Sequence, residues 1–138
     1  MTFIPIYKPY KAELQRELVL DCVDTNWISS QGSYTTRFES DFSNFTGSTH
    51  AITCSNGTVA LHLALLALGI SENDEVLVPS FTYIASVNSI RYVQAKPVFV
   101  DINIDDLQFS MSSMKERLSP KTKAVIIPHI YGYVGNMV

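Results

Sequence analysis

The residues best suited to bind a ligand are Ser55, Asn56, Gly57 and Thr58, which directly precede an apolar run typical of a helix. The free N–H groups and the dipole of a helix start favour an anion, most naturally a phosphate. Gly57 lets the backbone come close to such a ligand, and Thr58 adds a hydroxyl. Ser, Asn and Thr are also ordinary helix caps, so the spacing alone leaves both phosphate binding and simple capping open. The dinucleotide pattern G-x-G-x-x-G and the Walker pattern Gly-Lys-Ser/Thr are both absent from the sequence.

Three further loops carry polar or aromatic side chains after apolar runs. Tyr83 is able to stack on a flat ring beside a bound phosphate, although local packing of Phe81 and Tyr83 is the plainer interpretation. Asp101 either accepts a hydrogen bond from a ligand or caps a turn. His129 either donates to a ligand or bonds to backbone, as strand-end histidines commonly do. Each signal is weak alone, but four such loops at one edge of a sheet indicate a binding site.

Composition excludes several other classes of protein. The chain has 138 residues, with 13 acidic and 10 basic side chains and a net charge of −3, so it lacks the basic footprint of a nucleic-acid-binding protein. Hydrophobic residues make up 46% and charged residues 17%, which excludes disorder. His50 and His62 have no partner at metal-ligand spacing, and Cys22 and Cys54 lie far apart, so no metal site is predicted. The two cysteines are predicted to be buried free thiols in a reducing compartment.

No segment is predicted to span a membrane, because the longest apolar-rich run, residues 59–70, falls short of the roughly 20 residues needed. The start, Met-Thr-Phe-Ile-Pro, shows no basic segment followed by an apolar stretch, so no signal peptide is predicted. These features together predict a cytoplasmic location.

Residues 1–47 are predicted to form an N-terminal arm and two amphipathic helices. Prolines make the arm irregular, and the first helix is expected from Tyr10 until turn formers at residues 26–33 end it. The second helix is expected at residues 34–45, with Gly47 as its C-cap. The apolar stripes are Leu14, Leu18, Cys22 and Val23 in the first helix and Tyr34, Phe38, Phe42 and Phe45 in the second.

Residues 48–138 alternate between predicted strands and helices, which is typical of an α/β fold. Strands are expected at residues 50–54, 75–79, 96–102 and 123–130, and helices at residues 58–68, 82–93 and 112–118. This β-α-β-α-β-α-β order implies a parallel sheet with right-handed crossover helices, buried on both faces. The helix at residues 58–68 is apolar all round and is therefore expected to be buried. Parallel strands end at one common edge, where the four loops are expected to meet.

Six short motifs follow one another along the chain. They are Trp-Ile-Ser-Ser-Gln-Gly at residues 27–32, Ser-Asn-Gly-Thr-Val-Ala-Leu-His-Leu-Ala-Leu at 55–65, Gly-Ile at 69–70, Asp-Glu-Val at 74–76, Pro-Ser-Phe-Thr-Tyr at 79–83 and Pro-His-Ile-Tyr-Gly at 128–132. As an ordered set they resemble the start of the DegT/DnrJ/EryC1/StrS family of sugar aminotransferases. The resemblance runs from about Ile4 to the last residue, and the set is specific although no single motif is.

The resemblance implies part of the large domain of a fold-type I, pyridoxal 5′-phosphate-dependent aminotransferase, with a three-layer, mostly parallel sheet. Family members are homodimers with the active site at the subunit interface, and they move an amino group from glutamate to a keto-sugar on a nucleotide carrier. The nearest resemblance implies GDP-4-keto-6-deoxymannose as the acceptor and a product that feeds O-antigen synthesis.

The resemblance also implies roles for individual residues. Gly57 and Thr58 would hold the cofactor phosphate, in agreement with the helix-start argument, and Tyr83 would stack on the pyridine ring. The residues expected near the sugar substrate are Trp27, Ser29 and His129.

The chain departs from the family in length. The acidic residue that pairs with the pyridine nitrogen and the lysine that forms the Schiff base lie beyond Val138 in family members, so no catalytic residue is assigned. The lysines present are expected in the arm, in the first helix, at strand starts or on an exposed helix face: Lys8, Lys11, Lys96, Lys115, Lys121 and Lys123. We therefore expect a truncated chain, inactive alone, whose last strand leaves its sheet faces uncovered.

Two alternatives differ in class. The first is a non-catalytic binding module, or one half of a split enzyme, that docks on a partner chain. The second is a nicotinamide-dependent oxidoreductase, which shares the α/β pattern but is disfavoured because the first strand–helix loop offers one glycine rather than three.

Overall fold

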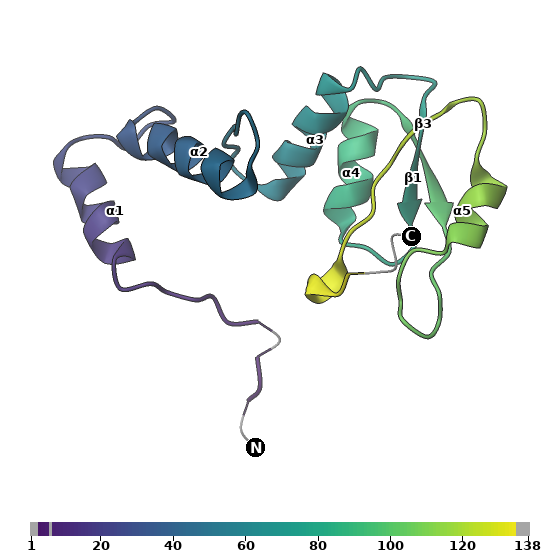
Figure 1. Cartoon of the computed structure of the whole chain (residues 1–138), viewed down its shortest axis with the longest axis horizontal. Helices are drawn as coiled ribbons and strands as arrows, with labels where there is room; N and C mark the ends of the chain where they lie inside the picture. The colour runs from purple at the N-terminus through teal and green to yellow at the C-terminus, as the bar shows by residue number, and fades with distance from the viewer. Residues whose placement is uncertain (1–2, 6, 135–138) are drawn as a thin grey trace. The chain divides into compact units, whose positions relative to one another are not determined.

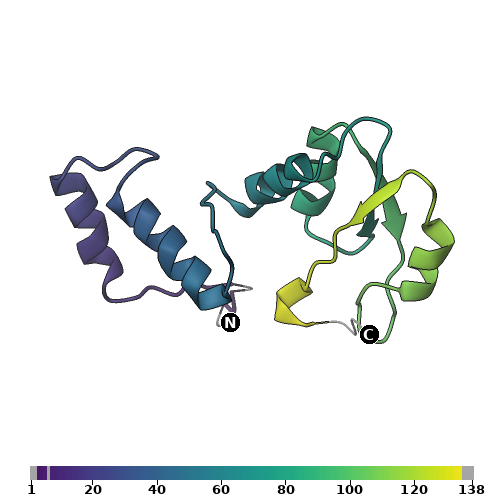
Figure 2. The same ribbon diagram turned by 45° about the horizontal axis from the view of Figure 1, so that its top comes forward.

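A computed structural model describes residues 3–5 and 7–134 of the chain. The chain divides into two compact units, one ending at Thr53 and the other beginning at Cys54 (Figures 1 and 2). Within the described ranges, no helix is both long and apolar enough to cross a bilayer.

The first unit contains two helices, α1 (Gln15–Asp24) and α2 (Ser33–Thr46). Gly47 ends α2 in the left-handed region at φ +70°, which confirms the predicted C-cap, and the Ser48 N–H donates to the Ser43 carbonyl at 3.0 Å. The predicted start of the first helix at Tyr10 is wrong, because regular structure begins only after a turn in which the Gln15 N–H donates to the Ala12 carbonyl.

The second unit is built on a three-stranded parallel sheet of β1 (Glu75–Pro79), β2 (Lys96–Val100) and β3 (Thr122–Val125). The order is β2-β1-β3, so β1 is central. All five residues of β1 are buried, as expected for a parallel strand covered on both faces. The predicted parallel sheet is confirmed.

Helices cover both faces of this sheet. The connection from β1 to β2 passes through α4 (Ile84–Tyr92), and the connection from β2 to β3 passes through α5 (Met111–Arg117). These two crossovers run in opposite directions along the sheet, so right-handed crossovers place α4 and α5 on opposite faces (Figure 1). The helix α3 (Gly57–Ala67) packs against α4, and a short 3₁₀ turn, η1 (Ile130–Gly132), follows β3.

The main core lies between β1 and the helices α3 and α4. Its members are Leu65, Ile70, Val76, Val78, Ile90, Val93 and Ala95, with Val87, Ala124 and Ile126 packed beside them. Leu77 points to the opposite face of β1 and is only 1% exposed. Burial of these aliphatic side chains on both faces makes β1 the centre of the unit.

The predicted strand at residues 50–54 is wrong, because this segment pairs with no strand among residues 3–5 and 7–134, where the sheet has three strands rather than four. Instead, the Thr53 N–H donates to the Glu39 carboxylate on α2. An apolar run predicts a buried, extended chain, but pairing also needs a neighbouring strand, which residues 50–54 lack. The predicted strands at residues 96–102 and 123–130 also end earlier, at Val100 and Val125.

The predicted burial of the first apolar helix is also wrong. In α3 only Leu65 is buried, whereas Val59, Leu63 and Leu66 are exposed. Among the described residues, α3 packs mainly against the helix α4 and reaches the core through Leu65, and no strand of the three-stranded sheet covers its remaining faces.

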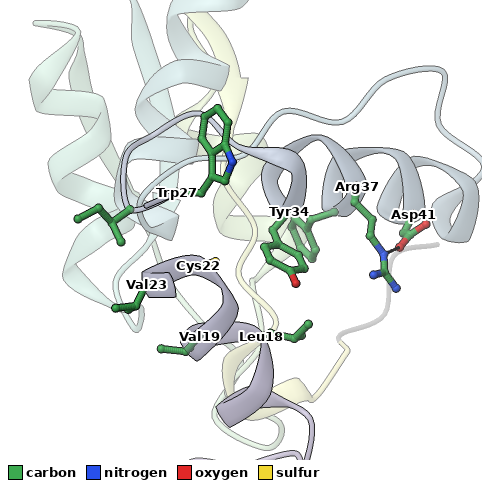
Figure 3. A pocket seen from close by; sticks show the side chains of 10 residues that line it. Leu18, Val19, Cys22, Val23, Trp27, Tyr34, Arg37 and Asp41 are labelled. Atoms are coloured by element: carbon green, nitrogen blue, oxygen red, sulfur yellow. Dashed lines mark ion pairs between the residues drawn. The ribbon is translucent and has the colours of Figure 1, made fainter. Parts of the chain in front are cut away.

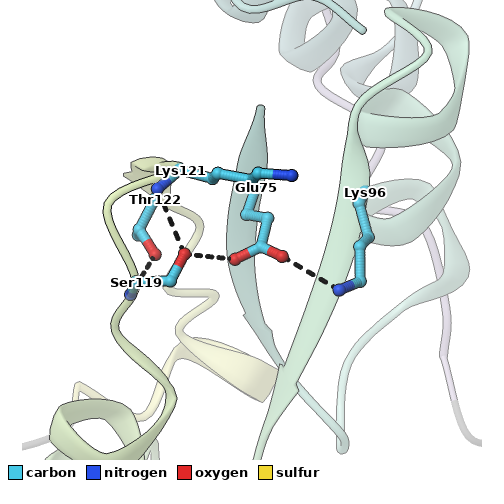
Figure 4. A network of polar contacts seen from close by, with 5 residues as sticks. All are labelled: Glu75, Lys96, Ser119, Lys121 and Thr122. Carbon is cyan, nitrogen blue, oxygen red and sulfur yellow. Dashed lines mark hydrogen bonds and ion pairs between the residues drawn. The ribbon is translucent and has the colours of Figure 1, made fainter. Parts of the chain in front are cut away.

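A polar network joins the amino ends of the three strands (Figure 4). The Glu75 carboxylate accepts hydrogen bonds from Lys96 Nζ at 2.9 Å and from Ser119 Oγ at 2.6 Å. Ser119 Oγ in turn accepts the Lys121 N–H at 3.1 Å, and the Ser119 N–H donates to Thr122 Oγ1 at 3.0 Å. The hydrogen bond from Ser119, followed by that from Lys96, lowers the pKa of Glu75 below its usual 4.5.

This network predicts that Glu75 stabilises the fold only when ionised. Because its pKa is lower in the folded than in the unfolded chain, its contribution is present above the usual value of 4.5 and is lost as the pH falls through the folded pKa. We expect Glu75→Gln to lower the Tm by several degrees at neutral pH and to match the wild type in acid, as measured by thermal unfolding followed by circular dichroism.

The matched control is Glu72→Gln, which removes an exposed carboxylate just before the same strand and is expected to leave the Tm unchanged. An equal Tm difference for Glu75→Gln in acid and at neutral pH would contradict the role given to the charge.

Candidate functional site

The start of α3 and residues near both ends of α4 line a single pocket of about 980 Å³. This pocket brings together Gly57, Thr58 and Tyr83, which the sequence analysis places in two separate loops. Its lining residues are Asn56, Gly57, Thr58, Val59, Ala60, Leu61, Tyr83, Ala85, Ser86 and Tyr92. Two of the four expected loops therefore meet at one site.

The helix start leaves two backbone donors free. Asn56 is the N-cap residue, and its side-chain oxygen accepts the Val59 N–H at 3.1 Å, while its carbonyl accepts the Ala60 N–H at 3.1 Å. Across the described part of the chain, the N–H groups of Gly57 and Thr58 make no hydrogen bond. Two adjacent free donors at the positive end of a helix dipole are suited to an anion.

Gly57 leaves open space beside these donors. A Cβ built at this position meets no atom within 4 Å, and the backbone does not adopt the left-handed conformation that would require glycine. Glycine is therefore not needed for folding here, and its small size widens the pocket next to the free N–H groups. This opening fits the phosphate group of the cofactor that the fold family implies.

Tyr83 provides a flat surface at the same pocket. It is the N-cap residue of α4, follows the carboxyl end of β1 and is 74% exposed. An exposed aromatic ring in an apolar-walled pocket is suited to stacking on a planar ring. The residues present therefore fit both halves of a phosphorylated aromatic cofactor.

Sequence reasoning missed Ser86 and Tyr92, which line the same pocket from α4. Ser86 is only 5% exposed, and its hydroxyl accepts a hydrogen bond from Thr82 Oγ1 at 3.0 Å. The available signal was helical spacing, because Ser86 lies three residues after Tyr83 and shares its side of the helix. Tyr92 packs edge-on against His62 of α3, with ring centroids 5.5 Å apart.

Asp101 and His129 are not among the residues that line this pocket. The Asp101 N–H donates to Ser113 Oγ at 3.1 Å, and that hydroxyl lies 3.5 Å from the Asp101 carboxylate, so the contacts favour the capping alternative. His129 is exposed and directly precedes η1, in which Tyr131 has a left-handed φ of +54°.

Trp27 and Ser29 belong to the first unit, in the loop between α1 and α2. Trp27 lines an apolar groove of about 490 Å³ together with side chains of both helices, such as Val23 and Tyr34 (Figure 3). It also lines a hollow of about 430 Å³ that is rich in hydroxyl groups. Ser29 Oγ donates to the Gln31 carbonyl at 3.3 Å, which holds the turn in the loop.

The capping contact at the pocket predicts a measurable stability effect. Asn56→Ala removes the acceptor for the Val59 N–H and should lower the free energy of unfolding by about 1 kcal/mol. Urea denaturation provides the measurement. Asn44→Ala, an exposed position within α2, is the matched control and should cost nothing. Equal unfolding midpoints for the two variants would contradict the cap.

With the fold and pocket described, similarity to known proteins identifies the class. Residues 9–138 match the DegT/DnrJ/EryC1/StrS aminotransferase family, so the chain belongs to that family. It is 50% identical to GDP-perosamine synthase of Escherichia coli O157:H7 over 137 residues, and 51% identical to GDP-perosamine synthase of Vibrio cholerae over 129 residues. These alignments cover 99% and 94% of this chain but only 38% and 35% of the relatives.

Solved structures agree with this assignment. The chain matches the Spr1654 protein of Streptococcus pneumoniae in its PMP form with a TM-score of 0.89 at 32% identity, covering 96% of this chain and 33% of that protein. It matches 3-amino-5-hydroxybenzoic acid synthase with a TM-score of 0.83 at 28% identity, covering 94% of this chain and 34% of that one. The fold is thus part of an aminotransferase large domain, as predicted, and the chain spans about a third of the length of its relatives.

Proposed function

We propose that this sequence takes part in pyridoxal 5′-phosphate-dependent transfer of an amino group from glutamate to a nucleotide-linked keto-sugar. The observation that carries the proposal is the pair of free N–H groups at Gly57 and Thr58, two residues that line the same pocket as Tyr83. Relatives of this chain at 50% and 51% identity are GDP-perosamine synthases, which supports a GDP-linked sugar as the acceptor. We propose an acceptor of the GDP-4-keto-6-deoxymannose type and a role in O-antigen synthesis. We further propose that the sequence works in the cytoplasm as part of a homodimer.

The residues of this chain bind and orient the cofactor in this proposal. The N–H groups of Gly57 and Thr58 donate to its phosphate, the Thr58 hydroxyl adds a third donor, and the Tyr83 ring lies against its pyridine ring. When bound, the cofactor supplies the electron sink for amino transfer. The loop with Trp27 and Ser29, together with His129, is proposed to face the sugar substrate.

We propose that the amine that anchors the cofactor aldehyde is not supplied by these 138 residues. Lys96 begins β2, and its ammonium is bonded to Glu75 at the edge of the sheet opposite Tyr83. Lys121 and Lys123 lie at the start of β3, at the same amino edge. The remaining lysines are exposed on α5 or in the first unit: Lys8, Lys11 and Lys115.

A second candidate function is that of a non-catalytic or split-enzyme half that binds a partner chain. The observation that favours it is the exposed apolar surface of α3, formed by Val59, Leu63 and Leu66. Co-expression with a chain that carries the missing lysine discriminates the two, because transaminase activity that requires both chains indicates a split enzyme.

The cofactor proposal predicts binding that depends on the phosphate group. Titration of the purified chain, followed by its intrinsic fluorescence, should show pyridoxal 5′-phosphate binding about tenfold more tightly than pyridoxal, since hydrogen bonds to a charged group are worth about 1.5–3 kcal/mol. Gly57→Ala should keep the Tm, because a methyl group there meets no atom within 4 Å, yet weaken binding of the phosphorylated form about tenfold.

Pyridoxal is the matched control, because Gly57→Ala should leave its weak binding unchanged. Borohydride treatment of the mixture should trap no lysine adduct that supports turnover. Equal affinity for the two ligands would contradict the phosphate site, and a trapped lysine that sustains amino transfer would contradict the missing anchor.

A further inference from the structure

Ser86 lies in the wall of the pocket, where neighbouring residues hold its backbone in place. It borders the pocket from α4 and is only 5% exposed. Its N–H donates to the Tyr83 carbonyl at 3.0 Å, and its carbonyl accepts the Ser89 hydroxyl at 3.0 Å. The position of Ser86 in the first turn of α4 is therefore fixed by the protein itself.

The hydroxyl of Ser86 differs from other hydroxyls within the helices. Serine and threonine in a helix commonly donate to a backbone carbonyl three or four residues earlier, as Ser89 does to Ser86 and Thr46 does to Phe42 at 2.9 Å. Ser86 Oγ instead accepts a hydrogen bond from Thr82 Oγ1 at 3.0 Å, and among the described residues it has no other hydrogen-bond partner. Because a hydroxyl has one proton to donate, the proton of Ser86 is left without an acceptor in this part of the protein.

A largely buried donor of this kind is suited to an acceptor in the pocket. Native structures pair nearly all buried polar groups, because an unpaired donor costs free energy. The pocket of about 980 Å³ that Ser86 borders offers the space for such an acceptor. The side of the pocket also matters, because Ser86 follows Tyr83 by three residues on α4, whereas the free N–H groups at Gly57 and Thr58 belong to α3.

We propose that Ser86 is a further ligand-binding residue of this pocket: its hydroxyl donates a hydrogen bond to an acceptor atom on the planar ring that stacks on Tyr83. This inference rests on the proposed function and gives the ring a polar partner separate from those of the phosphate. The Thr82 hydroxyl donates to the Ser86 oxygen and so leaves the Ser86 proton for the ligand. A planar ligand without a ring acceptor would leave this donor unpaired, so Ser86 makes the pocket selective for a heteroatom-bearing ring.

The test compares two ligands that share the ring, pyridoxal 5′-phosphate and pyridoxal. Ser86→Ala in the full chain should weaken binding of both by the same factor, about fivefold, because the lost hydrogen bond goes to the part that they have in common. Gly57→Ala, by contrast, should weaken only the phosphorylated ligand. Titration followed by intrinsic fluorescence gives the affinities, and thermal unfolding shows whether each variant is folded.

Two further variants separate ligand binding from general destabilisation. Ser89→Ala removes a fully buried hydroxyl from the same helix, at a position that does not line the pocket, and should bind both ligands like the wild type. Ser86→Thr keeps a hydroxyl and should restore most of the affinity. Equal losses of affinity in Ser86→Ala and Ser89→Ala would overturn the role of Ser86, and so would a loss in Ser86→Ala that is confined to the phosphorylated ligand.

Failure of the proposed function gives a different result. A wild type that binds pyridoxal 5′-phosphate no more tightly than pyridoxal would contradict the phosphate site, and the inference that rests on it would be overturned as well. A wild type that prefers the phosphorylated ligand, together with a Ser86→Ala variant that binds both ligands unchanged, would contradict the role of Ser86 alone.

Discussion

The first N–H groups of an α-helix have no acceptor inside the helix, and the phosphate site that we propose depends on this constraint. The Asn56 side chain accepts the Val59 N–H, and the Asn56 carbonyl accepts the Ala60 N–H in the first backbone hydrogen bond of the helix. The N–H groups of Gly57 and Thr58 are therefore the ones left for an acceptor outside the protein. The residue types agree with this division, because the amide side chain caps the helix and the glycine keeps the space beside it open. The geometry of the helix start therefore supports the anion binding that we propose, in which Tyr83 would add selectivity for a ligand with a flat ring.

The fold could be predicted from the sequence where local pattern and long-range pairing agree. The run Glu75–Pro79 is apolar, short and bounded by turn residues, and it forms the central strand with the predicted bounds. Residues 50–54 have a similar pattern but no strand partner, and their backbone donor is taken by the Glu39 carboxylate. The pattern of apolar residues indicates which segments tend to be buried. Whether a segment pairs as a strand, or a helix such as α3 is covered, depends on the other strands and helices that contact it.

In the candidate site, too, the residues in local motifs could be predicted from the sequence, whereas those that depend on tertiary contacts could not. Gly57, Thr58 and Tyr83 share a pocket because a helix start and a strand end have fixed local geometry that sequence motifs reveal. Asp101 fails as a pocket residue because its partner, Ser113, comes from the next helix, a tertiary contact that spacing does not encode. Ser86 was missed because a serine within a helix does not by itself indicate a binding site. Its burial and its hydrogen bond with the Thr82 hydroxyl are seen only in the structure.

The amino ends and the carboxyl ends of the strands differ in the polar groups that they place at the two edges of the sheet. At the amino edge, the Glu75 carboxylate accepts hydrogen bonds from Lys96 and Ser119 and so links all three strands. The negative charge of Glu75 is paired there with the positive charge of Lys96, so the contact stabilises the sheet. At the carboxyl edge, the loop after β1 leads to Tyr83 and the pocket. A strand of five residues separates these edges by roughly 16 Å, farther than a lysine side chain extends. The lysines of the amino edge would therefore be out of reach of a ligand ring stacked on Tyr83, which supports our proposal that they do not supply the reacting amine.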